Sequence, residues 1–138
     1  MAPERTTYNG PALSGAGIFC STSKIIKPEQ LSDATYNKWY NEVHIPDVLA
    51  TGGVSAAFRF KNANPNADRK YMALYLVPDL AVVQSEKFRA IPMTSDLMPN
   101  GGSCHEFIDF DTRFYKLEQD YNIKNVKETG NNSPGETF

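Results

Sequence analysis

This 138-residue sequence has only two cysteines and two histidines, and it contains no long apolar run. Cys20 and Cys104 form no spaced motif, so we expect free thiols and no disulfide framework. Paired ligand spacings such as C-x₂-C or H-x₃-H do not occur, so we expect no metal site. No apolar stretch approaches the ~20 residues needed to span a bilayer. The sequence therefore predicts a protein without structural metal, disulfide or membrane span.

A large excess of either charge is also lacking, since the sequence has 14 Lys and Arg residues and 16 Asp and Glu residues. The resulting net charge of -2 gives no general attraction to nucleic acid or to acidic lipid. The polar start of the chain lacks the apolar segment of a secretion signal. We therefore expect a cytoplasmic protein that binds neither nucleic acid nor membranes.

The chain has the length of one domain. Both ends are rich in polar and turn-forming residues, which predicts flexible tails over residues 1–14 and 123–138. The folded domain is expected to comprise residues 15–122. A chain of this size can bury roughly two thirds of its extended surface, enough for a core of its own.

Apolar periodicity predicts four strands and two helices within that domain. The expected strands are residues 17–26, 54–61, 70–77 and 107–115, and the expected helices are residues 28–51 and 79–91. Pro28 suits the first helical position, and Ser32 competes with it as an N-cap. Asp79 can cap the second helix. The order β-α-β-β-α-β is the ferredoxin-like arrangement, of the α+β class.

The predicted strands are apolar on both faces. Strand 70–77 alternates two sets of side chains, Tyr71, Ala73, Tyr75 and Val77 against Met72, Leu74 and Leu76. Phe58 and Phe60 alternate with Arg59 in the same way. Helices cover one face of such a sheet, and the other normally carries polar residues toward water. We therefore expect a homodimer that covers the second face, the alternative being a partly wet aromatic face.

Residues 36–47 carry most of the functional information. Their apolar side chains recur at i, i+3, i+4 and i+7 and form one stripe, made by Tyr36, Trp39, Tyr40 and Val43. His44 lies at the edge of this stripe, one turn after Tyr40. Because Pro46 has no N–H, it cannot bond to the carbonyl of Glu42, and we expect the helix to end or kink beside His44.

His44 is the first candidate for proton transfer, since an unperturbed histidine titrates near ~6.5. Tyr40 is its expected hydrogen-bonding partner. The structural alternative is that His44 closes a helix end by bonding to a carbonyl. Asp47 follows in the first turn of the next segment, where a carboxylate is favoured.

Arg59 stands between Phe58 and Phe60 on a strand with few polar residues. A guanidinium that faces a pocket can hold a carboxylate or enolate through paired N–H bonds. The alternative is an arginine at the edge of the sheet paired with Asp109 or Asp111.

Three further residues are weaker candidates. Tyr71 and Tyr75 can line an aromatic pocket and offer hydroxyls to a phenolic ligand, although packing is the more frequent reason for tyrosines at strand spacing. His105 directly follows Cys104, and adjacent residues of a strand point apart, which argues against a nucleophilic pair. His105 remains a candidate for a second pocket residue.

The pair Trp39-Tyr40 followed by His44-Ile45-Pro46 resembles the EthD-like family of dimeric α+β barrels. The Gly52-Gly53 turn and residues 57–60 are similar to that family as well, and the likeness covers residues 17–121. It implies two ferredoxin-like subunits joined through their sheets, each with a small-molecule pocket between sheet and helices. On this basis His44, Tyr40 and Arg59 are the expected catalytic residues. The expected substrate-binding residues are Trp39, Asp47, Phe58, Tyr71, Tyr75 and His105.

Relatives in that superfamily include cofactor-free polyketide cyclases, decarboxylases, quinone-forming oxygenases and muconolactone isomerases. The resemblance implies a cofactor-free enzyme of secondary metabolism that applies acid/base chemistry to a small aromatic or polyketide-type molecule. Decarboxylation or cyclisation is the expected reaction, with His44 protonating a carbonyl or carbanion and Arg59 or a tyrosine stabilising an enolate. The alternatives are an anthrone-type oxygenase and a noncatalytic binding protein.

Overall fold

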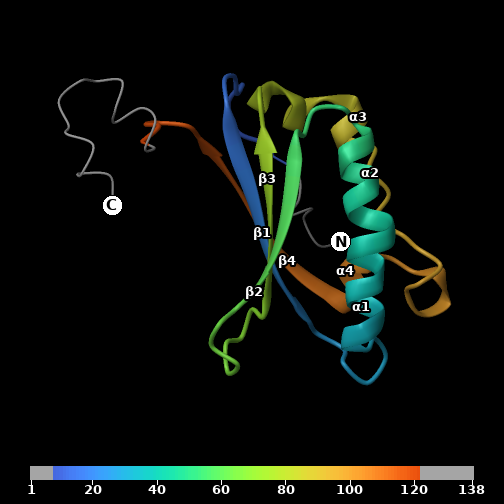
Figure 1. Ribbon diagram of the computed structural model, residues 1–138. Helices are drawn as coiled ribbons and strands as arrows, with labels where there is room; N and C mark the ends of the chain where they lie inside the picture. The colour runs from blue at the N-terminus through green and yellow to red at the C-terminus, as the bar shows by residue number, and fades with distance from the viewer. Residues whose placement is uncertain (1–7, 122–138) are drawn as a thin grey trace.

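The computed structural model describes residues 8–121 and arranges them as a sheet with a helical layer on one side (Figure 1). The sheet is antiparallel and has four strands in the order β2-β3-β1-β4. The strands are β1 (Gly17–Ile25), β2 (Ala56–Lys61), β3 (Tyr71–Val77) and β4 (Ile108–Lys116). This strand order fits the α+β, ferredoxin-like arrangement that the sequence predicts.

The first helical segment is continuous and has three parts, of which Figure 1 labels α1 and α2. These are α1 (Asp33–Trp39), the π-helical turn η1 (Tyr40–His44) and α2 (Ile45–Ala50). Ser32 is the N-cap, and its Oγ accepts from the N–H of Thr35 at 3.1 Å, so the helix begins after Pro28. The helix does not end beside His44. Instead, the N–H of Ile45 bonds to the carbonyl of Tyr40, and this wider turn directly precedes Pro46.

The prediction of one helix over residues 79–91 is wrong, because this segment forms two short helices. The chain forms a 3₁₀ helix, η2 (Leu80–Gln84), and then the short α3 (Glu86–Arg89). Ser85 is extended between them and caps α3 by accepting from the N–H of Phe88 at 3.3 Å. Asp79 caps η2 as expected. The apolar stripe still faces the sheet, because Leu80, Val83 and Phe88 remain buried.

Two short helical turns precede the last strand, η3 (Pro99–Gly101) and α4 (Cys104–Phe107). Ser103 caps α4 by accepting from the N–H of His105 at 3.2 Å. The predicted start of the last strand at Phe107 is wrong, since β4 begins at Ile108.

The core lies between the sheet and the helical segment. Tyr36, Trp39 and Tyr40 are at most 2% exposed and face the sheet residues Phe19, Tyr75 and Phe110. On β3, Ala73, Tyr75 and Val77 are buried, whereas Met72, Leu74 and Leu76 are not. The predicted assignment of the two faces of β3 is therefore confirmed.

The opposite face of the sheet carries large apolar side chains that residues 8–121 leave exposed. Phe58, Phe60 and Tyr115 are 45%, 49% and 49% exposed, and Leu76 is 38% exposed. The register places these residues on the same side as Cys20 and Leu74. We call this surface the open sheet face.

Part of the predicted N-terminal tail packs on the domain. The ring of Tyr8 lies edge-on to Phe114, with centroids 5.4 Å apart, and the N–H of Leu13 donates to Gln84 at 2.8 Å. The predicted tail at residues 123–138 lies outside the described residues. Within residues 8–121 no helix combines the length and apolarity needed to cross a bilayer.

Candidate functional site

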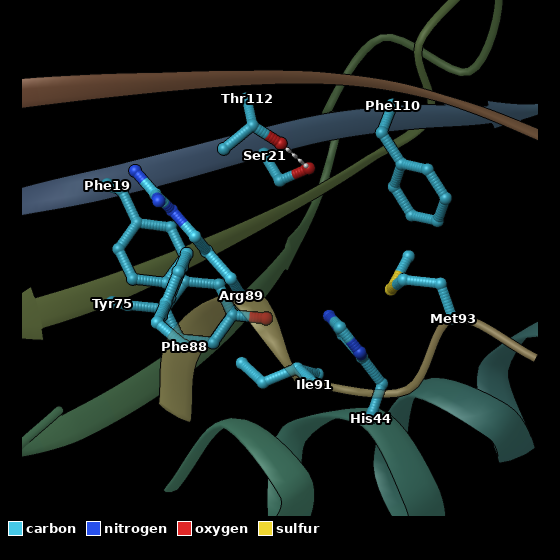
Figure 2. Close-up of a pocket in the computed structure, with 10 residues that line it drawn as sticks. All are labelled: Phe19, Ser21, His44, Tyr75, Phe88, Arg89, Ile91, Met93, Phe110 and Thr112. Carbon is cyan, nitrogen blue, oxygen red and sulfur yellow. Dashed lines mark hydrogen bonds between the residues drawn. The ribbon is translucent and has the colours of Figure 1, made fainter. Parts of the chain in front are cut away.

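A cavity of about 240 Å³ lies between the sheet and the helical layer (Figure 2). Strands β1, β3 and β4 form one wall, and His44, α3 and the loop after α3 form the other. The lining residues are Phe19, Ser21, His44, Tyr75, Phe88, Arg89, Ile91, Met93, Phe110 and Thr112.

His44 projects from the helix toward the sheet wall of this cavity (Figure 2). Its ring stacks on Trp39, with centroids 4.6 Å apart and an interplanar angle of 16°, and meets the edge of Tyr40 at 5.4 Å. Residues five apart in an α-helix differ by ~140° around the axis and do not stack. The π-helical turn changes this, because its wider winding brings His44 over Trp39. The turn therefore determines where the imidazole points.

The imidazole of His44 is neutral at neutral pH. Burial and, to a lesser extent, the nearby His105 together lower its pKa from 6.5 to about 4. Nδ1 is buried and has no hydrogen-bond partner in the described part of the chain. A neutral imidazole has one N–H donor and one acceptor nitrogen, so His44 can take a proton from a bound molecule.

Two hydroxyl groups mark the sheet wall opposite His44 (Figure 2). The hydroxyl of Thr112 donates to Ser21 at 2.9 Å. Neither residue is among the site residues predicted from the sequence, although Ser21 and Ser23 alternate on the buried face of β1, which is unusual for hydroxyl side chains. That alternation was the available signal.

Tyr75 adds an unpaired hydroxyl to an aromatic wall. Its ring stacks on Phe19 at 4.3 Å with an interplanar angle of 15°, and Phe88 meets Phe19 edge-on at 5.3 Å. The hydroxyl is buried and has no partner within residues 8–121. Because burial raises the pKa of Tyr75, this hydroxyl stays protonated and can donate a hydrogen bond to a ligand.

Tyr40 lies behind the cavity wall. Burial raises the pKa of its hydroxyl above the ordinary value, and hydrogen bonds with Ser21 and Ser23 oppose part of that rise. Ser23 also hydrogen-bonds to the hydroxyl of Tyr36. Tyr40 therefore belongs to a buried hydroxyl network that supports Ser21 and contacts His44 through its ring edge.

Arg59 does not line the cavity. It donates to Asn41 at 3.0 Å, and its guanidinium lies 4.5 Å from the ring centroid of Tyr40 and 5.3 Å from that of Tyr71. The alternative pairing with Asp109 or Asp111 is wrong, because β2 and β4 form opposite edges of the sheet. Asp109 and Asp111 accept instead from other arginines, Arg69 at 2.7 Å and Arg113 at 3.1 Å.

Four of the other candidate residues do not line the cavity. Trp39 stands behind His44, and Phe58 lies on the open sheet face. Tyr71 donates its hydroxyl to Asp33 at 2.8 Å, and Asp47 borders a separate shallow depression beside Lys87. Of the predicted site residues, His44 and Tyr75 line the cavity.

His105 lies near His44 without lining the cavity. Its ring meets the edge of Phe110 at 5.5 Å, and its buried Nε2 has no partner in the described range. Cys104 is buried, which raises its pKa to about 12, so it is a poor nucleophile. The two residues lie on α4 and not on a strand, so the geometric reason given from the sequence is wrong. Across residues 8–121 no group of three or more His, Cys, Asp or Glu side chains can hold a metal.

Part of this chain is similar in sequence to a fungal protein. The chain is 38% identical over 72 residues to "Core atranone cluster (CAC) protein 1" of Stachybotrys chlorohalonatus (strain IBT 40285). The match covers 52% of this chain but 30% of that relative. No protein-family model and no solved structure matches the chain. The likeness suggests involvement in secondary metabolism, and the relative's whole activity does not transfer on so short an overlap.

Proposed function

We propose that this protein is a cofactor-free tailoring enzyme of secondary metabolism that moves protons on a small aromatic or polyketide-type molecule. One observation carries the proposal: a neutral imidazole with an unpaired Nδ1 faces an aromatic cavity. The relative named for the atranone cluster and the resemblance to the EthD-like family support the same metabolic setting.

The reaction begins with proton abstraction by His44. A neutral imidazole takes the proton from a phenol or from a carbon next to a carbonyl, and Tyr75 donates a hydrogen bond to the enolate oxygen that forms. The imidazolium lies in a site that disfavours its charge, so it returns the proton readily. An enolate that attacks a second carbonyl closes a ring, which makes cyclisation the favoured reaction.

Decarboxylation of a β-keto acid is the second candidate, favoured by the donor hydroxyl of Tyr75. As carbon dioxide leaves, the bonding electrons form an enolate whose oxygen accepts from Tyr75, and the carbon later takes a proton. Neither route uses Arg59 as the enolate donor, because its guanidinium lies among tyrosine rings away from the cavity. Arg59 and Tyr40 instead support the wall behind His44.

The proposal includes a homodimer formed through the open sheet face. Its exposed side chains, including Phe58, Phe60 and Tyr115, are too apolar for a face that meets water. A second copy of the sheet supplies a matching apolar surface and completes a two-subunit barrel.

The function is tested in the producing organism after deletion of the gene. We expect the wild-type gene to restore metabolite production and His44→Ala to accumulate the same compound as the deletion strain. Lys38→Ala is the matched control, because Lys38 is exposed on the same helix and should restore production. Full restoration by His44→Ala would remove His44 from the chemistry and overturn the proposal.

The formulae of the accumulated compound and the final product identify the reaction. Loss of carbon dioxide indicates a decarboxylase, and loss of water or an unchanged formula indicates a cyclase. Gain of oxygen supports the oxygenase instead. If the deletion accumulates no compound, the noncatalytic binding protein is the better account.

A further inference from the structure

Among the residues that line the cavity, Arg89 is the one that is charged at neutral pH. The other lining residues are aromatic, apolar or hydroxyl-bearing, and His44 is neutral because of its burial. No carboxylate lines the cavity. The Arg89 side chain has no ion pair within residues 8–121. An uncompensated guanidinium at an aromatic cavity attracts an anion.

The positions of Arg89 and His44 give the cavity two different ends. Arg89 ends α3, is exposed, and extends its side chain toward the sheet (Figure 2). In contrast, the Nδ1 of His44 and the hydroxyl of Tyr75 are buried. A ligand can therefore keep a charged group near water at Arg89 while its neutral part enters the cavity that His44 and Tyr75 line.

The size and walls of the cavity restrict the rest of the ligand. Its volume of about 240 Å³ is below the roughly 300–1,000 Å³ of pockets that hold drug-sized molecules. The stacked rings of Phe19 and Tyr75 present a flat aromatic surface. A planar ligand with one or two rings fits these limits better than a larger polycycle.

We infer that the cavity takes a small planar aromatic acid, whose carboxylate or phenolate binds Arg89 while its reacting part faces His44. This inference rests on the proposed function, because it names the substrate class of the same site. Arg89 is thus a specificity-determining residue that pairs with the anion in the geometry arginine favours.

The test measures binding of 1-hydroxy-2-naphthoic acid and of its methyl ester by isothermal titration calorimetry. We expect the full-length wild-type protein to bind the acid at least roughly tenfold more tightly than the ester. Arg89→Gln should remove this preference, and Arg89→Lys should retain part of it. Lys87→Gln is the matched control on the same helix, since Lys87 does not line the cavity, and it should leave the preference unchanged.

Equal affinity for acid and ester in the wild type would overturn the inference, as would a preference that survives in Arg89→Gln. Failure to bind either probe would also overturn it, because the cavity would then not accept a planar aromatic acid. These binding results do not decide the proposed function, which is tested separately with His44→Ala. Loss of metabolite production in His44→Ala would stand even if Arg89 proves indifferent to charge.

Discussion

At the scale of single residues, burial gives His44 properties that its identity alone does not. The sequence points to His44 because histidines are few and one follows an aromatic stripe. It does not reveal that the ring stacks on Trp39 or that its pKa falls to about 4. The stacking depends on the π-helical turn, and the burial that lowers the pKa depends on neighbours supplied by distant elements. We therefore propose that His44 acts first as a base, where the sequence pointed to general acid/base chemistry.

The lowered pKa of His44 predicts a pH-dependent stability. The unfolded chain binds a proton near pH 6.5, whereas the folded chain resists it until about pH 4. The stabilisation is therefore complete above pH 6.5 and is lost as the pH falls toward 4. Over that window wild type should lose about 3 kcal/mol more free energy of unfolding than His44→Gln. Urea denaturation at several pH values measures this difference, and parallel curves would contradict it.

The buried pair Ser23 and Tyr36 gives a second test at this scale. Ser23→Ala leaves the hydroxyl of Tyr36 without its partner in a site that is 0% exposed. We expect a loss of about 1–3 kcal/mol in the free energy of unfolding. The double variant Ser23→Ala/Tyr36→Phe should cost less than the sum of the two single variants, as measured by urea denaturation. Additive costs would show that the hydrogen bond contributes little.

At the scale of elements, the apolar stripes were predictable and the breaks within them were not. The spacing from Tyr36 to Val43 identifies a helix, and it persists through the π-helical turn. The missing N–H of Pro46 predicts a lost bond but does not determine whether the chain ends, kinks or widens. At Ser85, helix continuation competed with capping of α3, and capping prevailed.

Ser85 should matter because α3 carries Phe88 and Arg89 to the cavity. Ser85→Ala removes the acceptor for the N–H of Phe88 and should lower the free energy of unfolding by about 1 kcal/mol. Ser85→Thr keeps a side-chain oxygen and should retain most of that stability. Chemical denaturation of the three proteins measures the effect. An unchanged Ser85→Ala would mean that another group caps α3.

At the scale of the whole molecule, strand alternation predicted both sheet faces, but not the cavity. The apolar residues at 58, 60, 72, 74 and 76 indicate a second apolar face from the sequence alone. The cavity is lined by residues of β1, β3, β4 and α3 and by His44, which lie far apart in the sequence. No local sequence pattern therefore identified Arg89, Met93 and Thr112 as lining residues.

The open sheet face predicts the oligomeric state. We expect wild type to sediment as a dimer at micromolar concentration. Phe58→Asp/Phe60→Asp should sediment as a monomer with unchanged far-ultraviolet circular dichroism, because both side chains are exposed in the single chain. Lys38→Asp, on the helical side, should remain dimeric. A monomeric wild type would refute the dimer without affecting the cavity.

We propose that His44 transfers a proton on a molecule bound in the cavity. The most direct test uses the compound that accumulates in the deletion strain and measures kcat/KM for purified wild type, His44→Ala and Lys38→Ala. We predict that His44→Ala loses about 10²–10⁴-fold in kcat/KM, mostly through kcat, while Lys38→Ala matches wild type. A His44→Ala protein that keeps kcat/KM within about tenfold of wild type would contradict the account.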